Sequence, residues 1–197
     1  NVVVGRNNAF THMDDSRVRA DYGGSDLPVV IGDSLISVGK PSKQSSNYNT
    51  ANSYPSEKAF DGRSWPEHGA NFSHTGSELQ PWIEVDLGRD YAVSKIVLVN
   101  RGDCCGNRLG KFRITVTQFP VLAFPQAGFV YENTTALSNG QVITIPVSVS
   151  GRYVRLWADN STPQPLHISE LSVYGKAKTT GIVCDTFKIV RDSIVCR

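Results

Sequence analysis

The chain has 197 residues and a mass of 21.5 kDa, which suits one full domain with or without tails. Hydrophobic residues make up 40% and charged residues 19%, a globular composition and not a disordered one. The net charge of +2 argues against a nucleic-acid partner, and no apolar run is long enough to span a bilayer, so neither nucleic-acid binding nor membrane insertion is expected.

Residues 1–33 are rich in turn and linker residues and predict an N-terminal arm. From residue 34 to 175 the apolar residues recur with a period of two, as where Ile83, Val85 and Leu87 alternate with acidic residues. Pro146 places its strand at an edge or a bulge. Comparable stretches lie at 96–99, 112–117, 143–147, 153–157 and 171–174. Short strands between clusters of Gly, Pro, Asn and Ser predict an all-β sandwich.

The tail, residues 176–197, predicts a hairpin, because the apolar stretches 187–190 and 194–195 flank a polar turn. Cys184 and Cys196 are expected on its two arms, where a cross-strand disulfide fits. We favour a tail that packs on the domain, since isolated hairpins are marginally stable. The alternative is a contact surface for another subunit.

The cysteines and the glycosylation sequons favour an extracellular protein. The four cysteines, which allow three connectivities, have no zinc-site spacing. Sequons begin at Asn71, Asn133 and Asn160. Their combination favours secretion, and the start at Asn1 is typical of a mature or trimmed form.

Cys104 and Cys105 are neighbours in the sequence, which is unusual. Their Cα atoms are about 3.8 Å apart across a trans peptide, whereas ordinary disulfides span roughly 4.4 to 6.8 Å. A bond between them is therefore strained, and such strain collects at functional sites. Two reduced thiols, or crossed bridges to Cys184 and Cys196, remain open from spacing alone.

Arg101 and Arg108 flank this cysteine pair. Each guanidinium offers five donors and no acceptor. On one rigid loop they suit a ligand with several converging hydroxyl or ether oxygens. Two ordinary surface arginines are the alternative, and the cysteines between them make it the less favoured one.

The segment around the cysteines, with 26 residues between His74 and Arg101, resembles the signature of the F-type lectins, or fucolectins. The segment reads Arg101-Gly102-Asp103-Cys104-Cys105-Gly106-Asn107-Arg108. Shorter resemblances extend over about residues 34–175 and also fit the wider discoidin or coagulation-factor C-type sandwich. They lie at 38–46, 59–62, 81–87, 151–154 and 169–175.

The resemblance implies an eight-stranded jelly-roll sandwich with a shallow sugar site at one end. It implies that His74, Arg101 and Arg108 hydrogen-bond terminal L-fucose. A vicinal disulfide, Cys104–Cys105, would pack against the sugar ring. A site built around hydroxyl geometry rejects epimers, because its buried donors would be left unpaired.

The remaining loops differ from those of the best-known members of the family. Trp65 and Phe72 are candidates for contact with the fucose methyl group, although aromatic residues are usually core. Further sugars are expected to contact Glu67, His68 and Asn49.

The resemblance also implies a structural calcium ion. Asp61 and Glu170 match its side-chain ligands, and carboxylate and backbone oxygens suit Ca²⁺. The other candidate ligands are Lys58, Arg63, Asn71 and Ser169. A glycan on Asn71 would crowd both sites, so we expect Asn71 to be unmodified and Asn133 and Asn160 to be the better acceptors.

These features predict a non-catalytic, secreted lectin for fucosylated glycans. Modest single-site affinity makes a homo-oligomer expected, because useful avidity needs several sites. A discoidin-like adhesion or phospholipid-binding module, with Trp65 and Phe72 as apolar spikes, is the alternative. The sequence contains neither a nucleophile elbow nor a metalloprotease motif, so it gives no sign of an enzyme. The Arg101-Gly102-Asp103 tripeptide is read as part of the sugar signature and not as an integrin motif.

Overall fold

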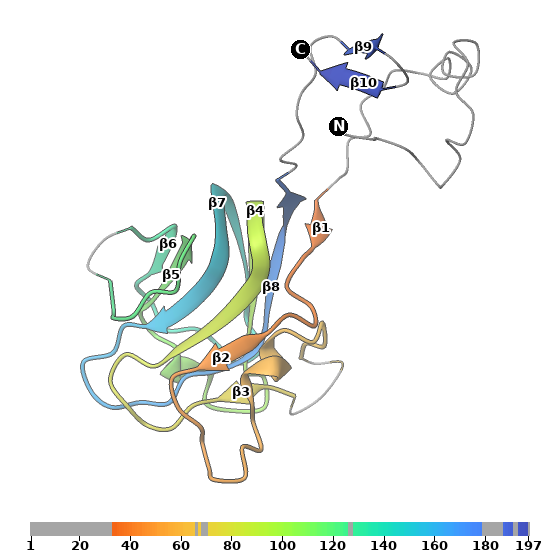
Figure 1. The fold of residues 1–197 in the computed structure, drawn as a ribbon. Helices are drawn as coiled ribbons and strands as arrows, with labels where there is room; N and C mark the ends of the chain where they lie inside the picture. Colours follow the sequence, from red (N-terminus) through yellow and green to blue (C-terminus); the bar gives the residue numbers. More distant parts are fainter. Residues whose placement is uncertain are drawn as a thin grey trace. The chain divides into compact units, whose positions relative to one another are not determined.

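The computed structural model describes residues 33–65, 67, 71–125 and 128–178, and the backbone of residues 187–190 and 193–196. Gly32–Lys178 form one compact unit (Figure 1). A second unit comprises residues 1–31 and 179–197, most of which lie outside the described residues. No helix of the described part is long and apolar enough to cross a membrane.

Eight strands of the compact unit form a continuous antiparallel sheet in the order β1-β8-β4-β7-β5-β6, with β2 also on β4 and β3 also on β8. The strands are β1 Ser34–Leu35, β2 Ser42–Gln44, β3 Ser73–His74, β4 Trp82–Asn100, β5 Phe112–Thr117, β6 Tyr131–Asn133, β7 Val142–Ala158 and β8 His167–Ala177. The helical elements are the 3₁₀ turns η1 Ser56–Ala59 and η2 Gly106–Arg108. The predicted all-β, eight-stranded domain is confirmed.

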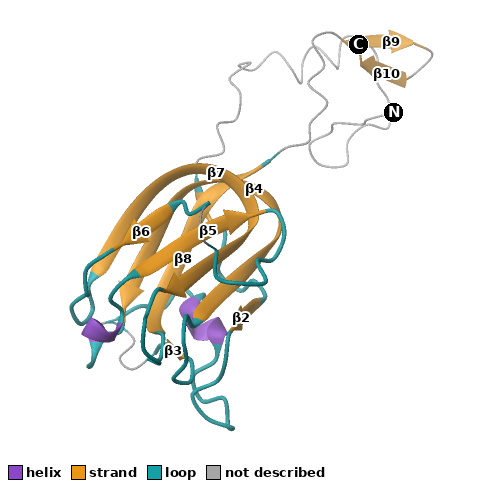
Figure 2. Ribbon diagram, turned by 90° about the vertical axis from the view of Figure 1, so that its left-hand side faces the viewer, coloured by secondary structure: helices purple, strands orange, loops and turns teal. Residues whose placement is uncertain are grey.

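The two longest strands, β4 and β7, contribute to both layers of the sandwich. β2 pairs with the first part of β4, and β8 pairs with its second part, from Tyr91 onward. The register shifts between Asp86 and Tyr91 and again between Val93 and Lys95. These irregularities allow the long strands to curve from one layer into the other (Figure 2).

The period-two pattern places the core where the sequence predicts it. Ile83, Val85 and Leu87 are buried, as are Phe112 and Ile114 of β5. They join one hydrophobic cluster between the layers. Alternation along a strand sends successive side chains to opposite faces, so one face of each strand fills this core.

Pro146 lies opposite Lys95 at a register shift, in the part of β7 that pairs with β4 alone. Its missing N–H therefore interrupts no ladder on the other side. The expectation of an edge or bulge position is confirmed.

The predicted C-terminal hairpin is also confirmed in the backbone. β9, Phe187–Val190, pairs antiparallel with β10, Ser193–Cys196. Cys184 lies outside the described residues, so the Cys184–Cys196 disulfide stays a prediction.

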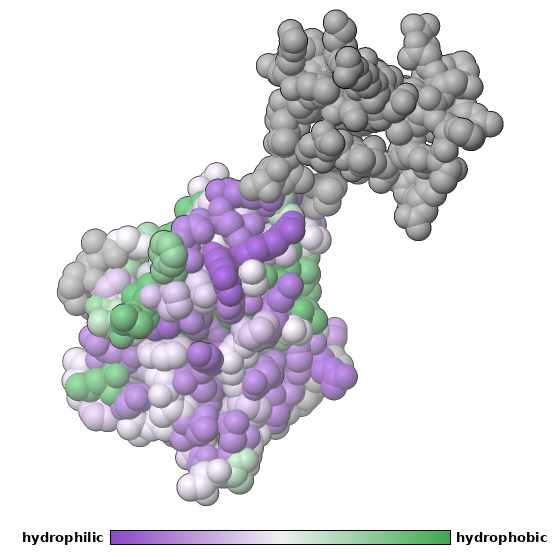
Figure 3. Space-filling view, in the orientation of Figure 1, coloured by the Kyte–Doolittle hydropathy of each residue, from purple (hydrophilic) through white to green (hydrophobic). Residues whose placement is uncertain are grey.

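The surface of the compact unit is mostly hydrophilic in the view of Figure 3, with apolar atoms gathered near β5 and β6. Phe119 and Leu122, in the loop after β5, are 80% and 96% exposed. The pocket described next lies at the end of the sandwich where β3 and the loop after β4 meet.

Candidate functional site

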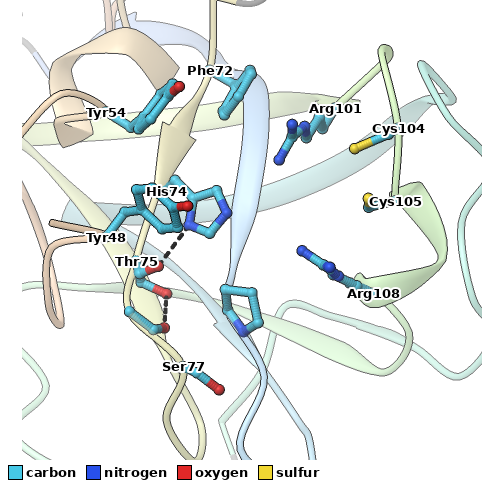
Figure 4. A pocket seen from close by; sticks show the side chains of 12 residues that line it. Tyr48, Tyr54, Phe72, His74, Thr75, Ser77, Arg101, Cys104, Cys105 and Arg108 are labelled. Atoms are coloured by element: carbon cyan, nitrogen blue, oxygen red, sulfur yellow. Dashed lines mark hydrogen bonds between the residues drawn. The ribbon is translucent and has the colours of Figure 1, made fainter.

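Five residues expected to bind sugar line one pocket: His74, Arg101, Cys104, Cys105 and Arg108 (Figure 4). The pocket has a volume of about 480 Å³, within the range of small-ligand sites. His74 lies on β3, whereas the other four follow the end of β4. The pairing of both strands with β8 brings the two segments together.

His74 is fixed by its backbone as well as by its ring. Its N–H donates to the Tyr54 carbonyl at 3.0 Å, and its carbonyl accepts from the Tyr48 N–H at 3.1 Å. The side-chain amide of Gln44 donates to the same carbonyl. The loop 48–54 therefore holds β3 at the rim of the pocket.

The ring of His74 carries its proton on a defined nitrogen. Nδ1 lies 2.6 Å from the Thr75 carbonyl, which can only accept, so Nδ1 is the protonated nitrogen. Burial lowers the pKa of His74 below its ordinary value, against the raising effect of that hydrogen bond, and Arg101 and Arg108 lower it further. The neutral ring thus has an acceptor, Nε2, beside two cationic donors.

Arg101 is oriented on three sides. Its Nε and Nη2 donate to the Asp103 carboxylate at 2.6 and 2.9 Å, and its guanidinium lies 4.1 Å from the centroid of the Phe72 ring. Its backbone N–H donates to the side chain of the fully buried Asn100. Two of five guanidinium hydrogens are used by Asp103, so three remain for a ligand.

Asn100 is a site-building residue for which the sequence interpretation assigned no role. Its side-chain amide donates to the carbonyls of Gly106 and Ser138 at 3.0 and 2.9 Å. It therefore ties the turn that contains Cys104 and Cys105 to the separate loop that contains Ser138. The signal that could have identified it is a polar residue directly after the apolar stretch that ends β4.

Cys104 and Cys105 are free thiols in this structure, so the disulfide implied by the family resemblance is not formed in it. A hydrogen bond with Cys105 raises the pKa of the Cys104 thiol. Cys105 has a left-handed backbone, with φ of 61°, and its carbonyl accepts from the Arg108 N–H. This turn presents Arg108, which pairs with no carboxylate of the described residues.

An aromatic wall faces these cations. Phe72 stacks on Tyr54 with ring centroids 4.8 Å apart and planes 5° from parallel. Tyr48 lies edge-on to Tyr54 and tilted over His74, at 4.5 Å between centroids. Phe72, a predicted methyl contact, lines the pocket. Sequence reasoning gave Tyr48 and Tyr54 no role, although two aromatic residues in one polar loop were the available signal.

Three other predicted sugar contacts lie outside the pocket lining. Trp65 packs against the backbone of Gly102. Asn49 hydrogen-bonds to Ser53 within its own loop. Glu67 is exposed. His68 lies outside the described residues.

The positions of Trp65 and Phe72 also bear on the alternative of a lipid-binding module. Phe72 is buried beneath Arg101, and Trp65 is half-buried against glycine. Neither side chain projects into solvent as an apolar spike, so these two residues give the alternative no support.

The expected calcium ligands converge beside the pocket. The Asp61 carboxylate accepts from the Asn71 side chain at 3.0 Å, and Asn71 also donates to the Arg63 carbonyl at 3.2 Å. Glu170 is 2% exposed and accepts from the Gly62 N–H. Ser169 donates to the Asn71 carbonyl. Lys58 differs, since its ammonium group donates to the Ser53 carbonyl and lies over the Tyr54 ring.

The chemistry of this cluster fits a hard cation. Burial and, to a lesser extent, the Asp61 charge together raise the pKa of Glu170 to about 7. Two carboxylates with carbonyl and amide oxygens form an oxygen-donor set, which Ca²⁺ prefers. The described residues contain no group of three or more His, Cys, Asp or Glu side chains placed for a metal, so most ligands would be carbonyl oxygens.

All three sequon asparagines are engaged in the fold. Asn71 belongs to the cluster just described. Asn133 donates to the Gly110 carbonyl at 2.9 Å, and Asn160 donates to the Glu78 carbonyl at 3.1 Å. Glycosylation at Asn133 and Asn160 therefore stays a prediction. It would require each side-chain amide to give up the hydrogen bond that it makes to a backbone carbonyl.

Comparison with protein-family models matches residues 58–156 to an F5/F8 type C domain, described as a NedA-like, galactose-binding domain. Fucolectin-6 of Anguilla japonica is 32% identical over 119 residues, which cover 58% of this chain and 60% of that protein. The chain thus spans less than two thirds of the length of this relative.

Two solved structures extend the similarity to the fold. An F-lectin (fucolectin) from the serum of the striped bass, Morone saxatilis, is 27% identical with a TM-score of 0.66, over 73% of this chain and 49% of that one. The lectin domain of lectinolysin, in complex with Lewis b antigen, is 28% identical with a TM-score of 0.57, over 73% of this chain and 98% of that domain.

Proposed function

We propose that this chain, which belongs to the F5/F8 type C family of galactose-binding domains, lies in the F-type lectin branch of that family and is a lectin for terminal L-fucose. The observation that carries the proposal is that His74, Arg101 and Arg108 line the same pocket. The proposed role is binding without chemical change of the sugar.

The hydrogen-bonding pattern of the pocket suits a hydroxyl group better than a charged ligand. A sugar O–H can donate to the neutral Nε2 of His74 while its oxygen accepts from Arg101 or Arg108. An anion would offer no hydrogen to His74, and an ammonium group would be repelled by both arginines. A hydroxyl-bearing ligand therefore satisfies all three side chains at once.

Fucose also carries a methyl group, for which the aromatic wall provides an apolar surface. Phe72 and Tyr54 present stacked rings at the side of Arg101. D-Galactose carries a hydroxymethyl group where fucose carries its methyl group. It also belongs to the D series of sugars, whereas L-fucose belongs to the L series. We therefore propose that two features together select fucose. The side chains of His74, Arg101 and Arg108 hydrogen-bond its hydroxyl groups, and the aromatic wall contacts its methyl group.

The adjacent thiols are proposed to close into a disulfide in an oxidising environment. The Cys104 and Cys105 thiols would form one S–S bond and release two protons and two electrons to an extracellular thiol oxidant. The product is a rigid, weakly polar plate on the wall of the pocket, suited to packing against a sugar ring.

A calcium ion is proposed at Asp61, Asn71 and Glu170, with the Arg63 carbonyl as a further ligand. Bound there, the ion would neutralise the Asp61 carboxylate and the buried Glu170 carboxylate and hold Asp61 and Asn71 together. It lies beside the pocket in this proposal and does not contact the sugar.

Extracellular location and multivalency complete the proposal. The similar striped bass lectin comes from serum, and the structure of the lectinolysin lectin domain is a complex with Lewis b antigen. We propose that this chain likewise meets fucosylated glycans outside the cell and does so as an oligomer.

A glycan array with the purified, oxidised protein tests this function. Glycans that end in L-fucose should retain the protein, and free L-fucose should release it while D-galactose should not. Retention on glycans that lack fucose, with no effect of free fucose, would exclude the proposed function.

A further inference from the structure

Trp65 packs closely against the backbone of the loop that presents Arg101. A Cβ atom added to Gly102 would be 2.1 Å from Cγ and Cδ2 of the Trp65 indole. The indole therefore occupies the space that any side chain at position 102 would need. Gly102 separates Arg101 from its ion-pair partner Asp103, so Trp65 contacts the turn that orients the guanidinium.

A second glycine completes the seat of the indole. A Cβ on Gly140 would be 2.7 Å from Cδ1 of Trp65. The N–H of Gly140 donates to the Arg101 carbonyl at 2.9 Å. The ring is thus fitted into a corner formed by two backbone segments that both bear on Arg101.

The backbone of Trp65 connects to the proposed calcium cluster. Its N–H donates to the Ser169 hydroxyl at 2.9 Å, and that hydroxyl donates to the Asn71 carbonyl at 3.0 Å. Asn71 in turn donates to the Asp61 carboxylate. Trp65 is therefore joined through Ser169 and Asn71 to the carboxylate proposed to hold the cation.

We propose that Trp65 is the positioning residue through which the proposed calcium cluster, Asp61, Asn71 and Glu170, sets the placement of Arg101 in the sugar pocket. The inference rests on the proposed function and goes beyond it, because it assigns a route between two sites. Trp65 contacts neither ligand in this account and acts through the Gly102 turn.

Thermodynamic linkage gives the proposal a measurable form. If calcium raises the affinity for fucose by a certain factor, fucose raises the affinity for calcium by the same factor. We expect that factor to be at least about fivefold in the wild-type chain, the lower end of typical coupling. Loss of the indole should bring it toward one while the cation ligands remain.

The test is a set of calorimetric titrations on the full chain with calcium and with a chelator. Trp65→Ala should bind calcium alone within about threefold of wild type, bind fucose at least about fivefold more weakly, and lose the calcium dependence of the fucose affinity. Trp65→Phe, which keeps an aromatic ring, should retain part of that dependence.

Glycine variants test the same contact without removing the indole. Gly102→Ala should weaken fucose binding, because its methyl group clashes with the ring. In the Trp65→Ala background the same change should have little further effect, since the space is empty. Gly110→Ala is the matched control, because no atom lies within 4 Å of its Cβ, and it should bind fucose as wild type does.

Each outcome decides between the readings. A wild-type calcium dependence retained in Trp65→Ala, or equal fucose affinity of wild type with and without calcium, overturns the inference. Loss of calcium binding in Trp65→Ala also overturns it, since Trp65 would then support the cation site itself. If Trp65→Ala does not fold, strictly additive effects of Trp65→Phe and Gly102→Ala overturn it. A wild-type chain that binds no fucose contradicts the proposed function instead.

Discussion

The bidentate ion pair between Arg101 and Asp103 explains how a surface-loop arginine acquires a fixed direction. Two short hydrogen bonds hold one edge of the guanidinium, and the Phe72 ring packs against one of its faces. Its partner Asp103 is only two residues away in the sequence, so forming the pair costs little chain entropy. A planar fork is essential to this arrangement, because an ammonium group makes no parallel pair of bonds.

Arg101→Lys should therefore weaken fucose binding about 10- to 100-fold, the equivalent of one or two charge-assisted hydrogen bonds, while the fold is retained. Calorimetric titration measures the affinity, and circular dichroism checks the fold. Arg152→Lys is the matched control, because Arg152 makes a similar pair with Asp86 outside the pocket. Equal affinity of Arg101→Lys and wild type would remove Arg101 from the ligand set.

The neutral form of His74 predicts the pH dependence of binding. Burial and the two arginines hold its pKa below 6.5. Fucose affinity should thus be constant from about pH 8 down to 6.5 and fall only at lower pH, as Nε2 becomes a donor. The same neutral ring is protonated more readily in the unfolded chain, so its contribution to stability is present above 6.5 and is lost as pH falls below that value.

A titratable group other than His74 would produce a different pattern. His74→Gln retains a hydrogen-bonding side chain that does not titrate, and its weaker binding should lack the acidic fall. An unchanged acidic fall in that variant, measured by calorimetry between pH 4.5 and 8, would assign the effect to another group.

Single residues of the site were predicted from sequence to differing degrees. His74, Arg101 and Arg108 were identified by a signature, and the structure gathers them. Tyr48 and Tyr54 were not assigned, since only the backbone contacts of their loop with β3 bring them over His74. Trp65 was expected to contact the sugar, but its indole packs against Gly102 behind the pocket instead. The sequence does not show that these two residues are neighbours in space.

At the scale of elements, the close packing of β5 against the middle of β7 depends on Gly151. A Cβ there would be 2.7 Å from Cγ1 of Val116 and 2.9 Å from the backbone of Thr117. The close approach of β5 to β7 at this point continues the sheet.

Gly151→Ala should lower the free energy of unfolding by about 1–3 kcal/mol, because the added methyl group overpacks the junction of the two strands. Chemical denaturation measures this loss, and the folded fraction should bind fucose normally, since the junction is not part of the pocket lining. Gly110→Ala should be far less destabilising. Comparable losses in both variants would show that crowding at Gly151 is not the cause.

Strand periodicity was sufficient to predict β5 at its observed bounds and the core residues of β4. It did not predict that residues 82–100 form one strand, because the apolar pattern marks only 83–87 and 96–99 as separate stretches. Gly88 has φ of 86° within the strand, at the shift of register. Local pattern cannot distinguish such a bulge from a chain reversal, since the pairing with β7 decides it.

At the scale of the whole molecule, calcium should contribute to stability. The buried Glu170 beside Asp61 is costly without a cation. Calcium at about 100 times its dissociation constant should add about 2.7 kcal/mol to the unfolding free energy. Thermal denaturation with calcium, magnesium or chelator measures this, and Asp61→Asn should reduce the calcium effect. No difference between calcium and chelator would contradict a calcium site.

Multivalency is the second property of the whole molecule. If the chain assembles, binding to a surface dense in fucose should exceed binding to free fucose by about 10²- to 10⁴-fold. Light scattering gives the mass, and surface binding at low and high glycan density gives the avidity. A monomer whose surface affinity does not change with density would contradict the expected oligomer.

The most direct test of the central claim is calorimetric titration of the oxidised chain with L-fucose, with D-galactose as control and calcium present. We predict one site per chain with a dissociation constant between about 1 μM and 1 mM for fucose, and no heat of binding for galactose. Absence of fucose binding to intact, folded protein would show that the pocket of His74, Arg101 and Arg108 serves another ligand.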